Sequence, residues 1–115
     1  MRYTVTLKKN RDFKSLYRQG KSSVSPILVL YCRRNRLGKN RIGISVGTKV
    51  GKAVVRNRVR RRIREAYRLI EHRVRPGYDL IVVARVRACA SAYREIADTL
   101  ETLLDRQGLL TGEEA

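Results

Sequence analysis

Arginine side chains crowd one segment of the sequence, and the chemistry that they suit best is the binding of phosphate. Residues 52–71 read KAVVRNRVRRRIREAYRLIE, with seven arginines between residues 56 and 68 and only Glu65 and Glu71 to offset them. Like charges four residues apart on a helix destabilise it by a few tenths of a kcal/mol per pair. Arginine can bind a phosphate through two hydrogen bonds at once, which offsets such repulsion. A charged face that is merely solvated is the plainer interpretation, but so few acids lie nearby that we expect this segment to bind nucleic acid.

The apolar residues of the same segment recur with helical spacing, which predicts a helix over residues 52–71. At about 100° per residue, they fall within an arc of about 120°. These apolar residues are Val55, Val59, Ile63, Ala66, Tyr67 and Ile70. The opposite arc carries Asn57, Arg58, Arg60, Arg61, Arg64 and Arg68. Pro76 and Gly77 end the pattern, because neither residue continues a helix well.

Three residues lead directly into this predicted helix: Lys49, Gly51 and Lys52. Glycine lets a backbone approach a ligand closely, and the first amides of a helix point outward toward anions. This turn could therefore receive an RNA phosphate. It could equally be a tight connection between a strand and a helix, and the sequence leaves both interpretations open.

Residues 10–20, NRDFKSLYRQG, predict a short helix that Asn10 caps and Gly20 ends. Phe13, Leu16 and Tyr17 share one of its faces. Aromatic rings beside positive charge stack on the bases of single-stranded RNA, although the same rings could also pack into the core. The pattern alone favours the core for Phe13 and Tyr17.

The remaining periodicities predict strands at residues 27–32, 41–46 and 79–86 and a last helix from Ser91 to near Gly108. A further short strand is expected near the start of the chain or at residues 21–24. The order is helix, strand, strand, helix, strand, helix. It predicts an α/β (α+β) two-layer sandwich, in which a mixed sheet of about four strands packs under the two long helices. The 115 residues fit one domain, 1–115.

Composition excludes several classes of protein. The net charge is +17, and the 43% of apolar residues exceeds what a disordered basic tail contains. The longest apolar run, residues 27–32, is far short of the roughly 20 residues that a membrane span needs, and no signal peptide precedes it, so we expect a cytoplasmic protein. Cys32 and Cys89 are expected to be reduced thiols, and His72, the only histidine, to be structural. We find no catalytic set and no metal site.

The charge is also distributed unevenly along the chain. Residues 1–94 hold 26 of the 27 basic residues and four acids, whereas residues 95–115 hold Arg106 and six acids. Within the second group, Glu95, Asp98, Glu101 and Asp105 recur at intervals of three and four, which predicts a solvent-facing stripe on the last helix.

Residues 45–68, SVGTKVGKAVVRNRVRRRIREAYR, closely resemble the signature of the bacterial ribonuclease P protein subunit: a basic loop after a strand, a Gly-x-Ala-Val turn, and Arg-Asn-Arg opening a basic helix. The matching residues are Lys49, Gly51, Ala53, Val54, Arg56, Asn57, Arg58, Arg60, Arg61, Arg64 and Arg68. The opening NRDFKSLYRQGK, the strand that ends in Tyr31 and the strand YDLIVVAR follow the order of that family. The resemblance reaches to about Leu104.

The resemblance implies a left-handed β-α-β crossover and a role as the accessory protein of a ribonucleoprotein endonuclease. The catalytic RNA subunit would remove the 5′ leader of precursor tRNA and leave a 5′-phosphate. Mg²⁺ would be held mainly by RNA and substrate phosphates, and no catalytic or metal-binding side chain is expected in this chain. The implied partners are the RNA subunit and precursor tRNA, with no membrane and no obligate protein partner.

The resemblance also assigns residues to the two RNA partners. Contacts with the RNA subunit are implied for Lys49, Lys52, Arg56, Asn57, Arg58, Arg60, Arg61, Arg64 and Arg68. Phe13, Tyr17 and Tyr31 match aromatic positions of a leader-binding cleft, which shifts the expectation for the first two toward leader contact. A ribosomal-type protein or RNA chaperone would be equally small and basic, and a self-sufficient protein nuclease would need an active site that the sequence lacks.

Overall fold

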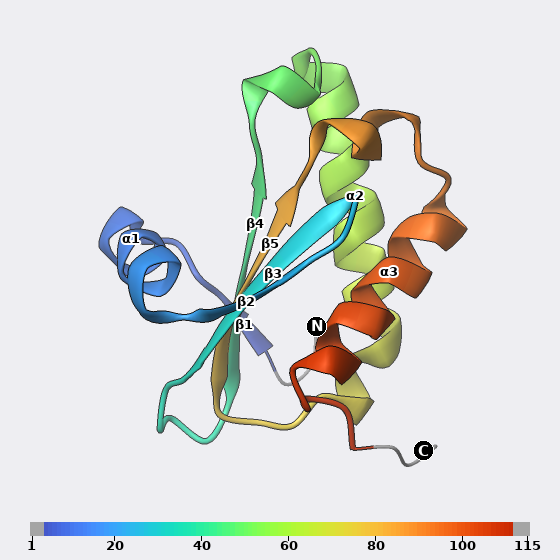
Figure 1. Ribbon diagram of the computed structural model, residues 1–115. Coiled ribbons are helices and arrows are strands. Elements are labelled where there is room, and N and C mark those ends of the chain that lie inside the picture. The colour runs from blue at the N-terminus through green and yellow to red at the C-terminus, as the bar shows by residue number, and fades with distance from the viewer. Residues whose placement is uncertain (1–3, 112–115) are drawn as a thin grey trace.

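The computed structural model describes residues 4–111, which form a five-stranded mixed sheet with α1 on one face and α2 and α3 on the other (Figure 1). The strands are β1 (Thr4–Thr6), β2 (Lys21–Val24), β3 (Leu28–Arg34), β4 (Asn40–Val46) and β5 (Tyr78–Ala84). The helices are α1 (Asn10–Gln19), α2 (Ala53–Ile70) and α3 (Tyr93–Arg106). The short 3-10 turns are η1 (Thr48–Val50), η2 (Glu71–Arg73) and η3 (Val86–Ala90). The α/β prediction is confirmed.

The strand order is β1-β4-β5-β3-β2, which places β5 at the centre of the sheet. β5 runs parallel to β4 and antiparallel to β3. The chain passes from β4 through α2 to the neighbouring parallel strand β5, and in Figure 1 this crossover is left-handed, as the resemblance implied. Parallel crossovers are nearly always right-handed.

The sheet has one strand more than the predicted number of about four. Both places considered for a further short strand form one: β1 near the start of the chain, and β2 at residues 21–24. They occupy the two edges of the sheet. Short, polar edge strands carry little of the apolar pattern from which a strand is predicted.

The large core lies between the sheet and the two long helices. From α2 it receives Val59, Ile63, Ala66 and Tyr67, and from α3 Ile96, Leu100, Leu103 and Leu104, all at most 2% exposed. The apolar arc predicted for residues 52–71 is therefore confirmed. Val55 and Ile70, near the two ends of α2, are only partly buried against this core.

α1 packs on the opposite face of the sheet over a much smaller core, made of Leu7, Leu16 and Ile81. The predicted cap at Asn10 is wrong: the helix starts one residue earlier in the chain, so that Asn10 is its first helical residue. Lys9 takes the cap position, with no side-chain hydrogen bond to the helix.

Gly20 ends α1, as predicted, but the reason is space rather than a left-handed backbone. Its φ is −79°, and a Cβ there would lie 2.6 Å from the carbonyl oxygen of Leu16 and 2.9 Å from its Cδ1. Any side chain at this position would push α1 away from the strand that follows.

α3 confirms the predicted last helix and its acidic stripe. Glu95 accepts a hydrogen bond from the backbone N–H of Ala92 at 3.0 Å, and Arg73 lies 3.1 Å from Glu101. Asp98 and Asp105 are exposed on the same helix. The two acids at positions 113 and 114 lie outside the described residues. Within residues 4–111, no helix is long and apolar enough to cross a membrane.

Candidate RNA-binding surfaces

Phe13, Tyr17 and Tyr31 come together on the α1 face of the sheet, and we call them the aromatic cluster. The ring centroids of Phe13 and Tyr17 are 6.3 Å apart, and those of Tyr17 and Tyr31 are 5.0 Å apart, both in edge-to-face geometry. Tyr17 is 40% exposed, whereas Phe13 and Tyr31 pack partly against the small core. Two of the rings therefore help to fix α1 and one presents its surface to solvent, and contact of these rings with the leader stays a prediction.

Gly43 of β4 lets Phe13 lie directly on the sheet. A Cβ at Gly43 would stand 2.4 Å from Cζ of Phe13, well inside van der Waals contact. The position of the ring therefore depends on the absence of a side chain in the strand beneath it. This close approach could not be foreseen from the sequence, because it joins two segments 30 residues apart through the tertiary fold.

Beyond the aromatic cluster, the sheet presents a row of side chains on the same face. Alternation along the strands places Ser45, Val83 and Val29 on the α1 face, in mutual register across β4, β5 and β3. Val24 of β2 continues the row and is 54% exposed. In Figure 1, α1 covers only part of this face, and the sheet continues past it. The aromatic cluster therefore borders a strip of three valines and Ser45 that an extended chain could cross.

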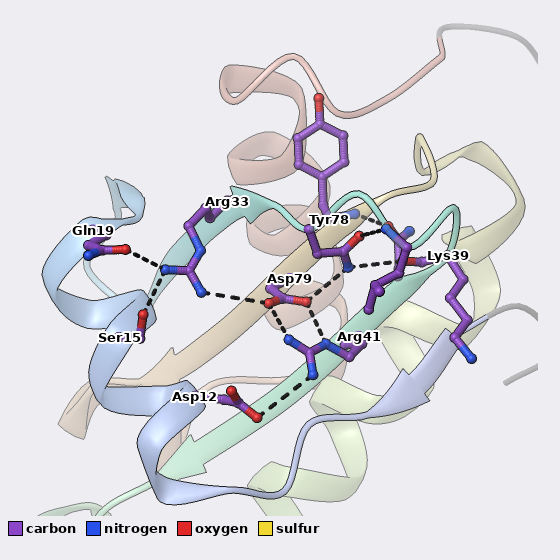
Figure 2. A network of polar contacts seen from close by, with 11 residues as sticks. Asp12, Ser15, Gln19, Arg33, Lys39, Arg41, Tyr78 and Asp79 are labelled. Carbon is purple, nitrogen blue, oxygen red and sulfur yellow. Dashed lines mark hydrogen bonds and ion pairs between the residues drawn. The ribbon is translucent and has the colours of Figure 1, made fainter.

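A buried carboxylate lies under the other side of α1 (Figure 2). Asp79, 2% exposed, accepts hydrogen bonds from Nε and Nη2 of Arg41 at 2.8 and 2.7 Å and from Nδ2 of Asn35 at 2.9 Å. Nη2 of Arg33 lies 3.9 Å from the same carboxylate. Burial would by itself raise the pKa of Asp79, but the hydrogen bonds from Arg41 and Asn35 hold that pKa below its ordinary value.

The two arginines that meet Asp79 also reach α1. Nη1 of Arg41 lies 3.7 Å from Asp12, and Nη1 of Arg33 donates hydrogen bonds to Ser15 at 2.7 Å and to Gln19 at 2.8 Å. Figure 2 shows these contacts joining the helix to three adjacent strands. We call this set the Asp79 network. It fixes α1 over the sheet and thereby sets the position of the aromatic cluster.

The Asp79 network was not predicted from the sequence. One signal was available: an aspartate opens the apolar run of residues 79–86, a place where a buried charge requires partners. Arg33 and Arg41 flank Asp79 directly in the register of β3 and β4. That register is not visible in the sequence.

The second surface is the arginine side of α2. Of the nine residues to which the resemblance assigned RNA contacts, six are exposed and three are half-buried. The exposed residues are Lys49, Lys52, Asn57, Arg61, Arg64 and Arg68. The half-buried ones are Arg56, Arg58 and Arg60. The structure brings all nine to one helix and its lead-in, and their contacts with RNA remain a prediction.

The arginines of α2 differ in what neutralises them. Arg68 makes a bidentate pair with Glu65 at 2.9 and 2.6 Å, and this pair lowers the pKa of Glu65. Arg62 donates to the backbone oxygen of Ser91 at 2.7 Å, which ties α2 to the turn before α3. Within residues 4–111, Arg61 and Arg64 have neither a hydrogen bond nor an ion pair through their side chains. Their charge is therefore available to a ligand.

Position 51, just before α2, requires a glycine for a structural reason. Its φ is +156°, and a Cβ there would lie 2.9 Å from Cγ1 and 3.0 Å from Cβ of Val55. Nε of Arg56 donates to the Gly51 carbonyl oxygen at 3.2 Å. These contacts support the tight strand-to-helix connection, one of the two interpretations that the sequence left open. An RNA phosphate at this turn stays a prediction.

The remaining candidate groups are dispersed. His72 is exposed, Cys32 and Cys89 carry free thiols, and burial raises the pKa of Cys32. Across residues 4–111, no three histidine, cysteine, aspartate or glutamate side chains come together in a way that could hold a metal ion. The residues described thus offer two surfaces suited to RNA and no grouping suited to a protein-bound cation.

Comparison with known proteins agrees with this arrangement. The family model described as Ribonuclease P matches residues 1–108. The chain is 45% identical to the ribonuclease P protein component of Clostridioides difficile strain 630 over 104 residues, which are 90% of this chain and 91% of the relative. It is 43% identical to the corresponding protein of Clostridium acetobutylicum over 110 residues, 94% of this chain and 92% of that one.

Solved structures show the same fold. The RNase P protein of Staphylococcus aureus superposes with a TM-score of 0.85 at 34% identity, covering 91% of this chain and 96% of the other. That of Thermotoga maritima superposes with a TM-score of 0.81 at 30% identity, covering 88% and 96%. The similarity extends over nearly the full length of every chain compared.

Proposed function

The chain belongs to the bacterial ribonuclease P protein family, and on this premise we propose that it binds two RNAs through two separate surfaces. The arginine side of α2 binds the catalytic RNA subunit. The aromatic cluster and the strip beside it bind the single-stranded 5′ leader of precursor tRNA. As a ribonuclease P protein component, the chain is a subunit of a tRNA-processing ribonucleoprotein endonuclease, and the RNA subunit is its partner.

The observation that carries the leader assignment is the exposed ring of Tyr17 beside this strip of the sheet. Stacking on an aromatic ring contributes about 1–3 kcal/mol per base and tolerates any base, because every base has a flat face. A leader of variable sequence needs this kind of contact. Lys14 and Arg18, both exposed on α1, supply positive charge for the backbone of such a strand.

The assignment of the RNA subunit to α2 rests on charge and rigidity. α2 is anchored by four buried side chains of its own, which pack against four from α3, so its arginines are held in fixed positions. Arg61 and Arg64 have no intramolecular counter-ion among the described residues, and guanidinium groups match phosphates in geometry. The resulting affinity should depend steeply on salt.

In the reaction, water attacks the phosphorus at the junction between leader and tRNA, the bond to the 3′ oxygen of the leader breaks, and the tRNA keeps a 5′-phosphate. We assign this chemistry to the RNA subunit. Mg²⁺, when bound to RNA phosphates, would activate the water and stabilise the charge that develops on the leaving oxygen. This chain binds the leader, holds it in an extended form and screens its charge, so that the junction stays in place during cleavage.

Cleavage of a 5′-extended precursor tRNA at low Mg²⁺ concentration tests the assignment. The protein alone and the RNA subunit alone should cleave poorly, whereas the two together should cleave efficiently and give a 5′-phosphate product. Cleavage by the protein alone would place the active site in this chain. A failure to stimulate cleavage in any mixture would favour a ribosomal or chaperone role.

A variant of the aromatic cluster tests the leader surface. Tyr17→Ala should weaken binding of precursor tRNA to the assembled enzyme about tenfold and leave binding of mature tRNA unchanged, since one stacked base is lost. Tyr17→Phe keeps the ring and serves as the matched control, with affinity close to that of the wild type. Equal losses for precursor and mature tRNA would contradict the leader role.

A further inference from the structure

The outer edge of the sheet is open beside the aromatic cluster. β1 pairs with β4 only from Asn40 to Ile42, although β4 continues to Val46. The N–H of Leu7 donates to the carbonyl oxygen of Ile42 at 2.7 Å, so the backbone groups of Ile42 face this outer side. Because the direction alternates along a strand, those of Ile44 face it too. Within residues 4–111, no strand pairs with Ile44 on that side.

A small cavity of about 110 Å³ lies at this open edge. Its lining comes from four elements or their flanks: Thr6, Leu7, Phe13, Ile42, Ile44, Arg60 and Arg64. Phe13 belongs to α1 and the two arginines belong to α2, on opposite faces of the sheet (Figure 1). The cavity therefore wraps around the edge of β4 and joins the surface that carries the aromatic cluster to the surface that carries the arginines.

The charged side chains at this cavity, Arg60 and Arg64, are both cationic. Arg60 donates to Oδ1 of Asn57 at 2.9 Å, and Arg64 has no side-chain partner among the described residues. None of the described residues that line the cavity is acidic. Two guanidinium groups four residues apart, together with an unpaired edge amide, call for an anion with several acceptor oxygens.

The size of the cavity limits what that anion can be. Pockets that enclose a complete small molecule have volumes of about 300–1,000 Å³, so this one suits a single phosphate group rather than a whole nucleotide. Its apolar wall, made of Phe13, Leu7 and Ile44, suits the sugar or base next to that phosphate. A phosphodiester within a chain satisfies both requirements.

We infer that this cavity binds one phosphodiester group of the leader, held by Arg60 and Arg64. At this place the leader RNA passes around the edge of β4 and onto the ring of Phe13. The inference rests on the proposed function, and it gives these two arginines to the substrate instead of the RNA subunit. Continuity favours the leader over the RNA subunit, because Phe13 lines the cavity and also contacts Tyr17 in the aromatic cluster. A strand stacked on the cluster brings a neighbouring phosphate to this place.

The test combines protein variants with leaders in which one phosphate is neutral. Precursor tRNAs carry a single methylphosphonate at successive positions of the leader, and their affinity for the assembled enzyme is measured with saturating RNA subunit. At one leader position, the neutral phosphate should weaken binding to the wild-type protein about tenfold, because one charge-assisted contact is lost. At that position, Arg64→Ala should bind the charged and neutral leaders with a smaller difference than the wild type does, and the double variant Arg60→Ala/Arg64→Ala should bind them equally.

Arg61→Ala is the matched control, because it removes an arginine of the same helix that does not line the cavity. It should remain sensitive to the neutral phosphate to the same degree as the wild type. In addition, Arg64→Ala should reduce the slope of log affinity against log salt for precursor tRNA by about 0.7, the value for one single-strand phosphate contact. Mature tRNA should show no change in slope.

Two results would overturn the inference. One is that Arg64→Ala keeps full sensitivity at every leader position. The other is that it weakens assembly with the RNA subunit as much as Arg61→Ala does and shows no coupling to the leader, which would place the phosphate in the RNA subunit. Either result leaves the leader surface itself intact as long as Tyr17→Ala still discriminates precursor from mature tRNA, so the two hypotheses fail separately.

Discussion

The two faces of the sheet hold their helices by different means. On one face, a cluster of 21 buried residues anchors α2 and α3, and the arginines of α2 take almost no part in it. On the other face, α1 rests on only three fully buried residues and on the Asp79 network. The arginine surface is therefore supported by the large apolar core, whereas the geometry of the aromatic cluster depends on a few polar contacts.

The largest effect on stability is expected in the large core between the sheet and the helices α2 and α3. Ile63→Ala should lower the free energy of unfolding by about 3 kcal/mol, because it leaves a cavity under α2 at a residue with no exposed surface. Urea unfolding monitored by circular dichroism measures this loss. Val54→Ala, on the same helix and 77% exposed, is the control and should change nothing. A loss below about 1 kcal/mol would mean that the large core repacks around the cavity and does not hold α2 rigidly.

The next largest effect is expected for Asp79→Ala, which should change the α1 face more than the α2 face. Asp79→Ala removes the acceptor shared by Arg41 and Asn35 and should lower the free energy of unfolding by about 2 kcal/mol, less than for a fully enclosed pair because Arg41 is partly exposed. Freed from the sheet, α1 should also move, so affinity for precursor tRNA should fall more than affinity for the RNA subunit.

Titrations of both RNAs measure this difference for Asp79→Ala. Asp98→Ala, which removes an exposed aspartate of α3, is the matched control and should leave both affinities unchanged. Equal falls in the two affinities would show that the network supports the whole fold rather than α1.

A smaller and more local effect is expected at the floor of the aromatic cluster. Gly43→Ala places a methyl group against the ring of Phe13 and should cost about 1–2 kcal/mol in stability while weakening leader binding severalfold. Unfolding and precursor binding are measured together. The control is Gly47→Ala, one residue past the end of β4, where a Cβ meets nothing within 4 Å. Unchanged leader binding would show that the position of the Phe13 ring does not matter to the RNA.

The smallest effect is the dependence of the α1 face on pH. The pKa of Asp79 is lower in the folded protein than in the unfolded chain. At a pH between these two pKa values, the unfolded chain therefore binds more protons than the folded protein does. The stability contributed by Asp79 is therefore present above about pH 4 and is lost as the pH falls through the folded pKa. Unfolding in urea from pH 5 to pH 2 should show a shallower decline for Asp79→Ala than for the wild type. Parallel declines would contradict a depressed pKa.

The sequence was sufficient to predict structure where the residues of a single segment determine that structure. The apolar arc of α2 follows from the spacing of Val59, Ile63 and Tyr67, and the structure buries these residues as predicted. The edge strands β1 and β2 were less certain because three or four mostly polar residues carry no pattern. The cap at Asn10 was wrong because a cap depends on the backbone angles of Lys9, which tertiary packing sets.

The candidate site divides in the same way. The arginine surface could be predicted because all its residues belong to one helix and its lead-in. The grouping of Phe13, Tyr17 and Tyr31 needed the family resemblance, and the Asp79 network was not foreseen at all. The network depends on the register between β3, β4 and β5, which sets Arg33 and Arg41 beside Asp79, and the cluster depends on the packing of α1 over β3.

The position of β5 has a consequence for the newly made chain. β3 and β4 are both complete by residue 46, but they are not neighbours in the sheet, and β5 must lie between them. During synthesis, β2 can pair with β3 and β1 with β4, yet these two pairs cannot join until residues 78–84 have emerged from the ribosome. α2 is already made by then, but β5 and α3, which contribute to the core that buries it, are not. We therefore expect the sheet of this small protein to close late in synthesis, because its central strand is the last one made.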